Sequence, residues 1–380
     1  MLDYEPHVHE PAVTESTHRY ITVQQHLIEQ QITHPTATGE FSWLLSGMTL
    51  ATKIIQTKVR RAGLINILGD RGTENVHGES QQKLDVFANE MIQYCLSFRG
   101  NVAVMASEEL DEPIVVKARN GHPKYVVVFD PLDGSTNLDG NVPVGTIFGI
   151  YRRVSHGPIT DGGYADVLQP GHRQLAAGYV VYGSSTVLAY TTGHGVHLFT
   201  LDPEAGSFML CNENVRIPDK GEKSRVYSVN EANFNSFPRG VQEWLRWAKT
   251  REAGPYSQRY IGSMVADVHR ILVSGGVFLY PPTAKTPRGK LRLLYEANPI
   301  AFLIEQAGGL ATDGHTRILD KQPTELHERT PLICGAAREV RQIMSMMDPN
   351  ATKGDITDFG QDATEVRGPA CKTATPFSSF

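Results

Sequence analysis

The chain has 380 residues, of which 40% are hydrophobic and 20% are charged, so it can bury one large core or fold as two domains. That composition excludes a disordered chain and a miniprotein held together by disulfides. With 36 basic and 41 acidic residues the formal net charge is −5, and we expect no nucleic-acid partner because no basic surplus faces a phosphate backbone.

The compartment signals predict a cytoplasmic protein without a membrane partner. Four cysteines are dispersed and form no CxxC pair, which is typical of a reducing compartment and argues against a zinc ribbon. No apolar run approaches the ~20 residues that a membrane-spanning helix needs. The first residues are polar and do not have the pattern of a signal peptide.

The first third of the chain is predicted to be mainly helical. Residues 1–20 are polar and indicate a mobile arm. Apolar residues at helical spacing predict helices over 42–59 and 84–95. Between them, 62–80 is rich in Gly, Asn and charge, which predicts a long loop of the kind that often closes over an active site.

Further along, short apolar runs separated by Gly-containing turns predict strands. The first group of runs comprises 101–106, 125–129, 146–151, 176–182, 186–190 and 197–201. Strands at 226–229 and 277–280 then alternate with helices, of which one spans 263–273 and ends at Gly275-Gly276. The last helix is expected to begin with Asn298 as N-cap and Pro299 at its first position.

The order helix, sheet, helix, sheet, helix predicts an α/β protein with alternating layers, α/β/α/β/α. We expect two domains with polar extensions at both ends, since the tail is polar with scattered Gly and Pro. The predicted divisions are an arm, 1–20, an N-terminal domain, 21–210, a C-terminal domain, 211–348, and a loosely ordered tail, 349–380.

The most informative motif is DPLDGST, which begins directly after the valine-rich run 125–129. Asp130 is therefore placed at the carboxyl end of a buried strand, where open α/β sheets build their sites. Pro131 and Gly134 predict a tight turn that lets Asp130 and Asp133 converge on one cation. The Gly-Ser-Thr that follows offers backbone N–H groups and hydroxyls to a phosphate. The alternative is an ordinary strand-end turn with solvated aspartates.

A second acidic pair, Glu108 and Glu109, follows the preceding predicted strand. If the two strands are parallel neighbours, both acidic pairs lie at one edge of the sheet. Two carboxylates ~4 Å apart repel each other by about 4 kcal/mol at an effective dielectric constant near 20, so the cluster stays ionised only beside cations. Ligation by oxygen alone favours Mg²⁺ or Mn²⁺. Further candidate carboxylates are Glu79, Asp85 and Glu296.

Hard divalent ions beside a phosphate-binding turn indicate metal-assisted phosphoryl chemistry. The sequence contains no GxxxxGK[ST] loop and no protein-kinase HRD or DFG set. Together these absences favour hydrolysis of a phosphate ester over phosphoryl transfer from a nucleotide.

These motifs resemble those of the class I fructose-1,6-bisphosphatases, within the lithium-sensitive, Mg²⁺-dependent sugar phosphatases. The resemblance extends from about Ile21 to Met347. DPLDGST alone would indicate only the superfamily, whereas RYIGSMVADVHR (259–270) and GKLRLLYE (289–296) narrow it to the bisphosphatases. Shorter matching blocks are KLDV (83–86) and SEE (107–109).

The resemblance implies the sugar-phosphatase fold and, in gluconeogenesis, hydrolysis of the 1-phosphate of fructose 1,6-bisphosphate to fructose 6-phosphate and phosphate. It also implies roughly two or three Mg²⁺ ions per subunit, with Mn²⁺ as an alternative. The implied ligands are Glu79, Glu108, Asp130, the Leu132 carbonyl, Asp133 and Glu296. Asp85 and Glu109, beside Glu108, match the catalytic carboxylates that take the proton from the attacking water.

The same resemblance assigns the substrate contacts. The 1-phosphate is expected at Asp133, Gly134, Ser135 and Thr136. The sugar and 6-phosphate are expected at Asn230, Tyr260, Gly262, Ser263, Met264, Tyr280, Lys290, Leu291 and Arg292. Arg259 matches an arginine that reaches a neighbouring subunit, which implies a homotetramer. Asn233 departs from the family, since animal members carry a tyrosine there.

A second site is also implied, for AMP as an inhibitor. Thr38, Gly39, Glu40, Phe41 and Ser42 open a predicted helix whose N–H groups suit an anion. Lys124, Tyr125 and Arg152 fall at the matching positions for AMP contacts. By itself, Thr-Gly-Glu at a helix start is an ordinary cap.

Two other functions remain open from the sequence. The same chemistry could act on sedoheptulose 1,7-bisphosphate or on a monophosphate such as inositol phosphate. A non-catalytic sensor of AMP or sugar phosphate is the alternative from another class, and the complete carboxylate set argues against it.

Overall fold

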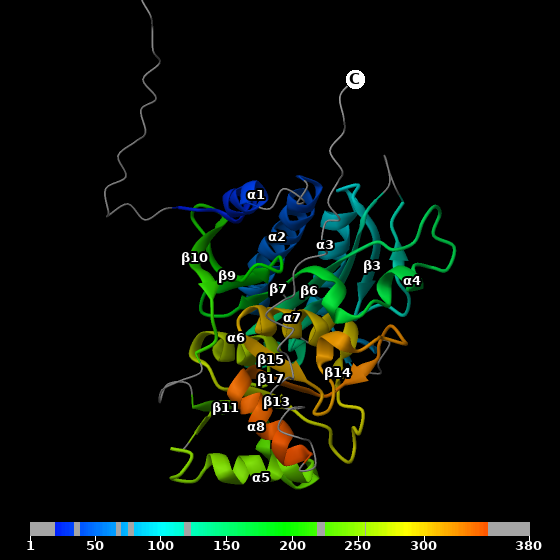
Figure 1. Cartoon of the computed structure of the whole chain (residues 1–380). Coiled ribbons are helices and arrows are strands. Elements are labelled where there is room, and N and C mark those ends of the chain that lie inside the picture. Colours follow the sequence, from blue (N-terminus) through cyan, green and yellow to red (C-terminus); the bar gives the residue numbers. More distant parts are fainter. Residues whose placement is uncertain are drawn as a thin grey trace, which may run out of the picture.

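The helices and sheets of the chain, seen in a computed structural model, are stacked in alternating layers (Figure 1). The structure describes residues 20–33, 39–65, 70–74, 80–117, 123–218, 225–254 and 256–348. The predicted tail and nearly all of the predicted arm lie outside these ranges. Thr38 and Glu79 also lie outside them.

Three N-terminal helices cover one face of the larger sheet (Figure 1): α1 (Val23–Thr33), α2 (Gly39–Val59) and α3 (Lys83–Ser97). Leu44 of α2 and Leu84 of α3 pack with Val127 and Phe129 of the sheet in one buried cluster. Both predicted helices are confirmed, with α2 beginning at Gly39 instead of residue 42. Their apolar residues recur at the spacing that gives a helix one buried face.

The predicted loop over 62–80 is wrong in part. A short 3₁₀ helix (Ala62–Leu64) is followed by two antiparallel strands, β1 (Asp70–Glu74) and β2 (Ser80–Gln82). Their sequences, DRGTE and SQQ, contain no large apolar residue. The alternation of apolar and polar residues that identifies a strand in a sequence is therefore missing.

The larger sheet has eight strands in the spatial order β10-β9-β8-β7-β6-β5-β3-β4. β3 and β5 are parallel, and every other neighbouring pair is antiparallel. All six strands predicted for this region are confirmed, and β4 and β10 add to them. In chain order the strands are β3 (Val102–Ser107), β4 (Ile114–Val115), β5 (Tyr125–Asp133), β6 (Val144–Arg152), β7 (Gln174–Tyr182), β8 (Thr186–Thr191), β9 (Val196–Asp202) and β10 (Ser207–Val215).

The smaller sheet has the order β12-β11-β13-β17-β15. Its strands are β11 (Val226–Ser228), β12 (Ser257–Gln258), β13 (Val277–Tyr280), β15 (Gly309–Thr312) and β17 (Leu332–Ala336). β14 (Leu291–Arg292) and β16 (Arg329–Thr330) form a separate two-stranded ribbon. The predicted strands at 226–229 and 277–280 are confirmed by β11 and β13.

Four helices complete the layers: α6 (Met264–Ser274) and α7 (Asn298–Gln306) between the sheets, and α5 (Arg239–Ala248) and α8 (Ala337–Met347) on the outer face of the smaller sheet. A single-turn helix, α4 (Tyr164–Val167), lies beside β3 and β5. The predicted α/β/α/β/α layering is confirmed. In α7 every residue from Asn298 to Glu305 is buried, as expected of a helix enclosed by sheets.

One predicted helix start is wrong. Asn298 does not cap α7, because a π-helical turn (Leu293–Ala297) runs directly into it and Asn298 is itself helical, with φ −62° and ψ −49°. An N-cap needs an extended conformation, which this continuous backbone does not allow. Within the described ranges, no helix is both long enough and apolar enough to cross a bilayer.

Candidate active site

Two parallel strands end side by side and present carboxylates at the same edge of the larger sheet. β3 and β5 are buried along their whole length, as their continuous apolar sequences predict. Ser107 pairs with Phe129 in the register, and Glu108 N donates to the Phe129 carbonyl oxygen at 3.2 Å. The predicted parallel pairing of these strands is confirmed. The sequences that follow them, Glu108-Glu109 and Asp130 onward, therefore lie next to each other.

The strand β5 does not end at Asp130, so the tight turn predicted from Pro131 and Gly134 is wrong for Pro131 and confirmed only at Gly134, where the chain turns with φ 77°. β5 continues to Asp133, and its register with β6 shifts between Asp130 and Asp133. This irregularity is a β-bulge, a feature common beside active sites because it redirects side chains. The Asp130 side chain stabilises the bulge by accepting a hydrogen bond from Leu132 N at 2.9 Å. Thr146 Oγ1 donates to the Pro131 carbonyl at 2.9 Å.

Glu296 reaches the same place from the other half of the chain, on the π-helical turn that precedes α7. Single π-turns are rare and are often found at functional sites. Arg292 N donates to Glu296 Oε2. The Arg292 guanidinium also forms an ion pair with Glu108, with Nη2 and Oε1 3.1 Å apart. Arg292 therefore supplies positive charge inside the acidic cluster.

Oxygen atoms of Glu108, Asp130 and Glu296 all lie within 4.8 Å of one another. Burial, followed by repulsion from Glu108 and Glu296, raises the pKa of Asp130 well above its usual range. Burial also raises the pKa of Glu296, to about 8, although the Arg292 charge opposes that change. Buried carboxylates that repel each other in this way favour a cation between them.

Asp133 lies in the same pocket and contacts the start of α6. Val265 N donates to Asp133 Oδ2 at 2.9 Å, and Ser263 Oγ lies 3.4 Å from the same oxygen. Burial raises the pKa of Asp133 to about 7, against the opposing hydrogen bond from Val265. Gly134 follows with φ 77°, and a Cβ there would lie 3.1 Å from Ser263 Cβ. Glycine thus permits both the left-handed backbone and the close approach of α6.

The sequence assigned no role to Asp267, which the structure places against the turn at Ile261 and Gly262. It accepts hydrogen bonds from Ile261 N at 3.0 Å, Gly262 N at 3.0 Å and Ser228 Oγ at 2.8 Å. This aspartate therefore fixes the turn that contains Gly262. The sequence does contain a signal for Asp267: it is an acidic residue in the first turn of a helix that follows a Gly-Ser turn.

Most of the predicted site residues line one pocket of about 160 Å³. The lining residues are Asp85, Glu108, Glu109, Asp130, Leu132, Asp133, Gly134, Ser135, Thr136, Tyr260, Gly262, Met264, Asp267, Phe278, Tyr280, Lys290, Leu291, Arg292 and Glu296. Ser263 reaches the pocket through Asp133. Asn230 and Arg259 are exposed and are not among the lining residues, and Asn233 is also exposed.

The acidic residues fit a hard divalent metal ion. Their donor atoms are oxygens only, and those of Glu108, Asp130 and Glu296 lie within 4.8 Å of one another. The pKa values of Asp130 and Glu296 are raised by burial and by repulsion from neighbouring carboxylates. Such a set matches the ligand preference of Mg²⁺ or Mn²⁺. Glu108, Asp130 and Glu296 would hold the ion, with Asp133 and the Leu132 backbone beside them.

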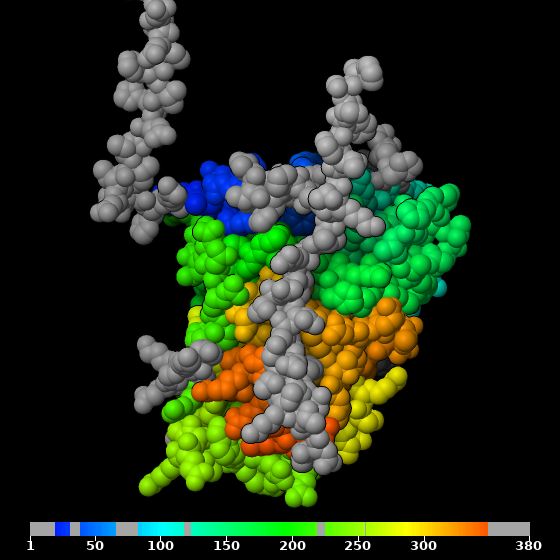
Figure 2. All heavy atoms as spheres, in the orientation of Figure 1, coloured from blue at the N-terminus to red at the C-terminus, as the bar shows by residue number. Residues whose placement is uncertain are grey.

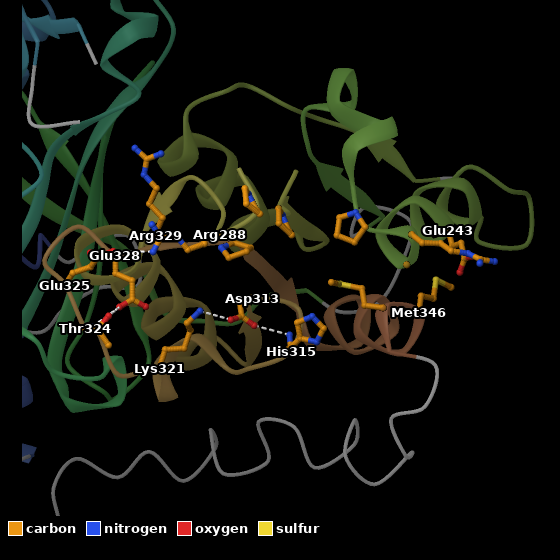
Figure 3. A pocket seen from close by; sticks show the side chains of 17 residues that line it. Glu243, Arg288, Asp313, His315, Lys321, Thr324, Glu325, Glu328, Arg329 and Met346 are labelled. Atoms are coloured by element: carbon orange, nitrogen blue, oxygen red, sulfur yellow. Dashed lines mark hydrogen bonds and ion pairs between the residues drawn. The ribbon is translucent and has the colours of Figure 1, made fainter. Parts of the chain in front are cut away.

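A larger pocket, of about 770 Å³, shares no lining residue with the acidic one (Figure 3). Several of its charged groups are paired with each other: Lys321 Nζ lies 2.6 Å from Asp313 Oδ2, and Arg239 Nε lies 2.7 Å from Glu243 Oε1. Glu328 Oε2 accepts hydrogen bonds from the backbone and the hydroxyl of Thr324. This pocket lacks the buried, mutually repelling carboxylates, so we assign the chemistry to the smaller one.

Of the residues predicted for AMP, those that the structure describes lie at and beside the start of α2; Thr38 is outside the described ranges. Glu40 Oε2 and Lys124 Nζ are 2.7 Å apart. The rings of Phe41 and Tyr125 meet edge to face with centroids 6.0 Å apart. Tyr125 pairs with Arg152 across β5 and β6. The group lies outside the acidic pocket, and Gly39 and Ser42 belong to the same first turns of α2.

Comparison with known proteins gives a consistent family assignment. Residues 21–213 match the family model "Fructose-1-6-bisphosphatase, N-terminal domain", and 218–348 match "Fructose-1-6-bisphosphatase, C-terminal domain". The class 1 fructose-1,6-bisphosphatase of Chlorobium luteolum is 52% identical over 324 residues, covering 84% of this chain and 96% of the relative. That of Chloroherpeton thalassium is 51% identical over 326 residues, covering 84% and 91%.

Solved structures give the same result. The holo form of Leishmania major fructose-1,6-bisphosphatase has a TM-score of 0.81 at 41% identity, covering 86% of this chain and 98% of that one. Its apo form has a TM-score of 0.77 at 40% identity, covering 86% and 99%.

The layered fold and the acidic pocket, together with these matches, define an α/β phosphatase of the sugar-phosphatase fold. More closely, the chain belongs to the class 1 fructose-1,6-bisphosphatase family. The resemblance stated from the motifs is confirmed.

Proposed function

We propose that this chain hydrolyses the 1-phosphate of fructose 1,6-bisphosphate with the help of Mg²⁺, giving fructose 6-phosphate and phosphate. The main observation that supports this proposal is that Glu108, Asp130 and Glu296 converge in a pocket that Ser135 and Thr136 also line. A metal site and a phosphate-binding turn in one pocket is the arrangement that metal-assisted hydrolysis requires.

The residues of the pocket have different proposed roles in the reaction. When bound, Mg²⁺ lowers the pKa of a water molecule and offsets the charge on phosphate oxygens. Asp85, buried in the first turn of α3, and Glu109 line the pocket, and their proposed role is to accept the proton of the attacking water. Gly134, Ser135 and Thr136 offer backbone N–H groups and hydroxyls to the 1-phosphate. Glu79 remains a proposed further ligand.

The far end of the substrate is proposed to contact Tyr260, Tyr280, Lys290 and Arg292, which line the same pocket. Exposed Arg259 has Nη1 bonded to the Gln258 carbonyl at 2.8 Å, and we propose that it serves a neighbouring subunit in a homotetramer. Asn230 lies two residues after β11, and its side chain caps a 3₁₀ turn by accepting from Ala232 N; it is a further proposed sugar contact.

Phosphate release tests this function directly. The enzyme with Mg²⁺ is expected to release phosphate from fructose 1,6-bisphosphate with a higher kcat/KM than from sedoheptulose 1,7-bisphosphate or inositol monophosphate. Activity should disappear in EDTA and return with Mg²⁺ or Mn²⁺. A chain that releases no phosphate from any of these substrates would be the sensor that the sequence left as an alternative.

Replacing Asp267 by asparagine is expected to raise KM for the bisphosphate roughly tenfold, with a smaller change in kcat. The amide nitrogen of asparagine would face the N–H donors of Ile261 or Gly262, and hydrogen bonds to a charged group contribute about 1.5–3 kcal/mol. Steady-state kinetics measure the split between KM and kcat. Asp202→Asn is a matched control, since Asp202 also accepts two backbone N–H bonds but lies outside the pocket.

We also propose that AMP inhibits the enzyme by binding at the start of α2. The proposed regulatory domain is 21–210, which also carries most of the metal ligands, and the proposed sugar-binding domain is 211–348. The clustering of Glu40, Phe41, Lys124 and Arg152 supports this site. A related Leishmania major enzyme has also been solved in a form described as T-state, with a TM-score of 0.76, which supports a fold with two states.

Lys124→Met is expected to raise the AMP concentration for half-inhibition about tenfold or more, since a charge-assisted bond to phosphate is lost. The activity without AMP should stay unchanged. Lys117→Met is the control, because Lys117 is an exposed lysine of the same domain outside the cluster. Full activity of the unaltered enzyme at millimolar AMP would contradict the proposal.

A further inference from the structure

Far from the acidic pocket, two histidines and a glutamate meet where α1 packs on the edge of the larger sheet. His26 lies on α1, His197 on β9 and Glu213 on β10. Figure 1 shows α1 lying against the β9–β10 edge. Backbone contacts hold this arrangement, since Leu210 N donates to the Ile21 carbonyl at 2.8 Å.

The three side chains offer one ligand atom each within 4.8 Å of one another. The imidazole rings of His26 and His197 have centroids 4.3 Å apart, and both residues are 1% exposed. The Glu213 side chain is 53% exposed and closes the cluster on its solvent side, with Oε1 3.6 Å from His26 Nε2. β10 departs from regular pairing with β9 at this point, between Leu210 and Val215.

Two buried nitrogens in this cluster lack a hydrogen-bond partner. Among the described residues, neither His26 Nε2 nor His197 Nε2 has one, and the 3.6 Å to Glu213 is too long for a hydrogen bond. Burial lowers the pKa of His26, against the opposing charges of Glu213 and Glu29, and lowers that of His197 to about 4. Neutral imidazoles with unpaired nitrogens are competent metal ligands.

The other nitrogen of each ring is held by a second group. His26 Nδ1 lies 2.5 Å from the Tyr190 hydroxyl oxygen. The His194 backbone carbonyl accepts a hydrogen bond from the His197 ring. His197 Nδ1 lies 3.5 Å from Asn214 N, at the limit of a hydrogen bond. Ligating histidines are typically oriented in this way, by a carbonyl or another polar group on the second ring nitrogen.

We infer that His26, His197 and Glu213 form a second metal site, which binds a transition-metal ion of the Zn²⁺ type. Two imidazole nitrogens and one carboxylate suit Zn²⁺, Co²⁺ or Ni²⁺, whereas Mg²⁺ prefers oxygen ligands alone. Ligand atoms on tetrahedral zinc lie roughly 3.4 Å apart, and the exposed Glu213 side chain is free of the packing that would prevent such an approach. Water would complete the coordination from the solvent side.

This ion would join α1 to β9 and β10. Each of the three elements supplies one ligand, so binding would restrain the first helix of the chain against the sheet. α1 immediately precedes α2, whose first turn carries Glu40 and Phe41. The ion would therefore stabilise the helical layer that carries the proposed AMP site.

The test uses the full-length protein, stripped of metal and supplied with saturating Mg²⁺ to occupy the oxygen site. Zn²⁺ binding is measured by equilibrium dialysis, and Co²⁺ binding by the strong visible absorption of four-coordinate cobalt. The unaltered chain should bind Zn²⁺ and raise its melting temperature on doing so. Glu213→Gln and His197→Gln should weaken Zn²⁺ binding about 100-fold, and Tyr190→Phe about tenfold.

Glu213→Gln is the decisive variant, because Glu213 is exposed and its replacement leaves the core unchanged. His156→Gln, at another exposed histidine, should bind Zn²⁺ as the unaltered chain does. Equal Zn²⁺ affinity in Glu213→Gln and the unaltered chain would overturn the inference, and so would the absence of any Zn²⁺ binding in the presence of Mg²⁺. A protonated His26 at neutral pH in a histidine NMR titration would also overturn it, since the cluster would then be an ion pair.

Discussion

Asp130→Asn is expected to lower kcat by on the order of 10³-fold, about 4 kcal/mol of transition-state stabilisation, while the fold is retained. Asp130 is buried beside Glu108 and Glu296, so an amide there weakens the proposed metal site at its centre. The hydrogen bond from Leu132 N can still form to the amide oxygen, which preserves the bulge of β5. Phosphate release and circular dichroism measure the two effects.

The same substitution is expected to make the metal-free protein more stable to heat. Repulsion from Glu108 and Glu296 opposes an ionised Asp130, and a neutral asparagine removes that repulsion. A substitution that lowers kcat and at the same time raises the melting temperature has removed a functional carboxylate, whereas general damage to the fold would lower both. Asp139→Asn is the control, because Asp139 is exposed in the 3₁₀ turn after the motif. An Asp130→Asn enzyme that keeps the unaltered rate would refute the metal-site proposal.

Glu109→Gln separates proton transfer from metal binding. Loss of a general base typically costs 10²–10⁴-fold in rate, so kcat should fall within about that range while the Mg²⁺ affinity changes little. If Mg²⁺ affinity falls as far as kcat, Glu109 is a ligand and the proposed division of roles is wrong.

The sequence predicts the site residues whose positions follow from local sequence patterns, and it does not predict those whose positions depend on tertiary contacts. The parallel ends of β3 and β5 follow from two continuous apolar runs and the acidic pairs after them, so the positions of Glu108 and Asp130 are legible in the sequence. Neither the bulge at Pro131 nor the π-turn that carries Glu296 could be predicted in this way, because the bulge arises where β5 pairs with β6 and the π-turn runs directly into α7 without a capping residue between them. Local propensity cannot specify a register that tertiary contacts impose.

The ion pair between Arg292 and Glu108 illustrates the same limit. The motif predicts Arg292 as a substrate contact. Only the folded chain shows that its positive charge also compensates the negative charge of the acidic cluster. Asp267 belongs to a recognised motif, but its hydrogen bonds with Ser228 and Ile261 could be identified only in the folded chain. The His26, His197 and Glu213 group has no spacing typical of a metal site, because its members are far apart in the chain and meet only at the α1–sheet contact.

Removing Mg²⁺ is expected to make the melting temperature fall as the pH rises from 6 to 9. In the folded, metal-free protein the pKa of Asp130 is raised, and those of Asp133 and Glu296 are raised to about 7 and about 8, whereas unfolded carboxyls titrate near about 4. A carboxyl group with a raised pKa stabilises the fold fully below its unfolded pKa, and that stability is lost as the pH passes the folded pKa.

Scanning calorimetry in EDTA at pH 6 and pH 9 measures this effect. Each pKa unit corresponds to about 1.4 kcal/mol, and about 1 kcal/mol moves the melting temperature of a large domain by roughly 2–4 °C, so a decrease of roughly 5 °C or more is expected. Mg²⁺ should abolish most of it, because a bound cation compensates the ionised carboxylates. Asp130→Asn should flatten the dependence in EDTA, which assigns the effect to this cluster instead of to ionisable groups elsewhere. A melting temperature in EDTA that stays level or rises toward pH 9 would mean that these carboxylates are already compensated without a metal ion.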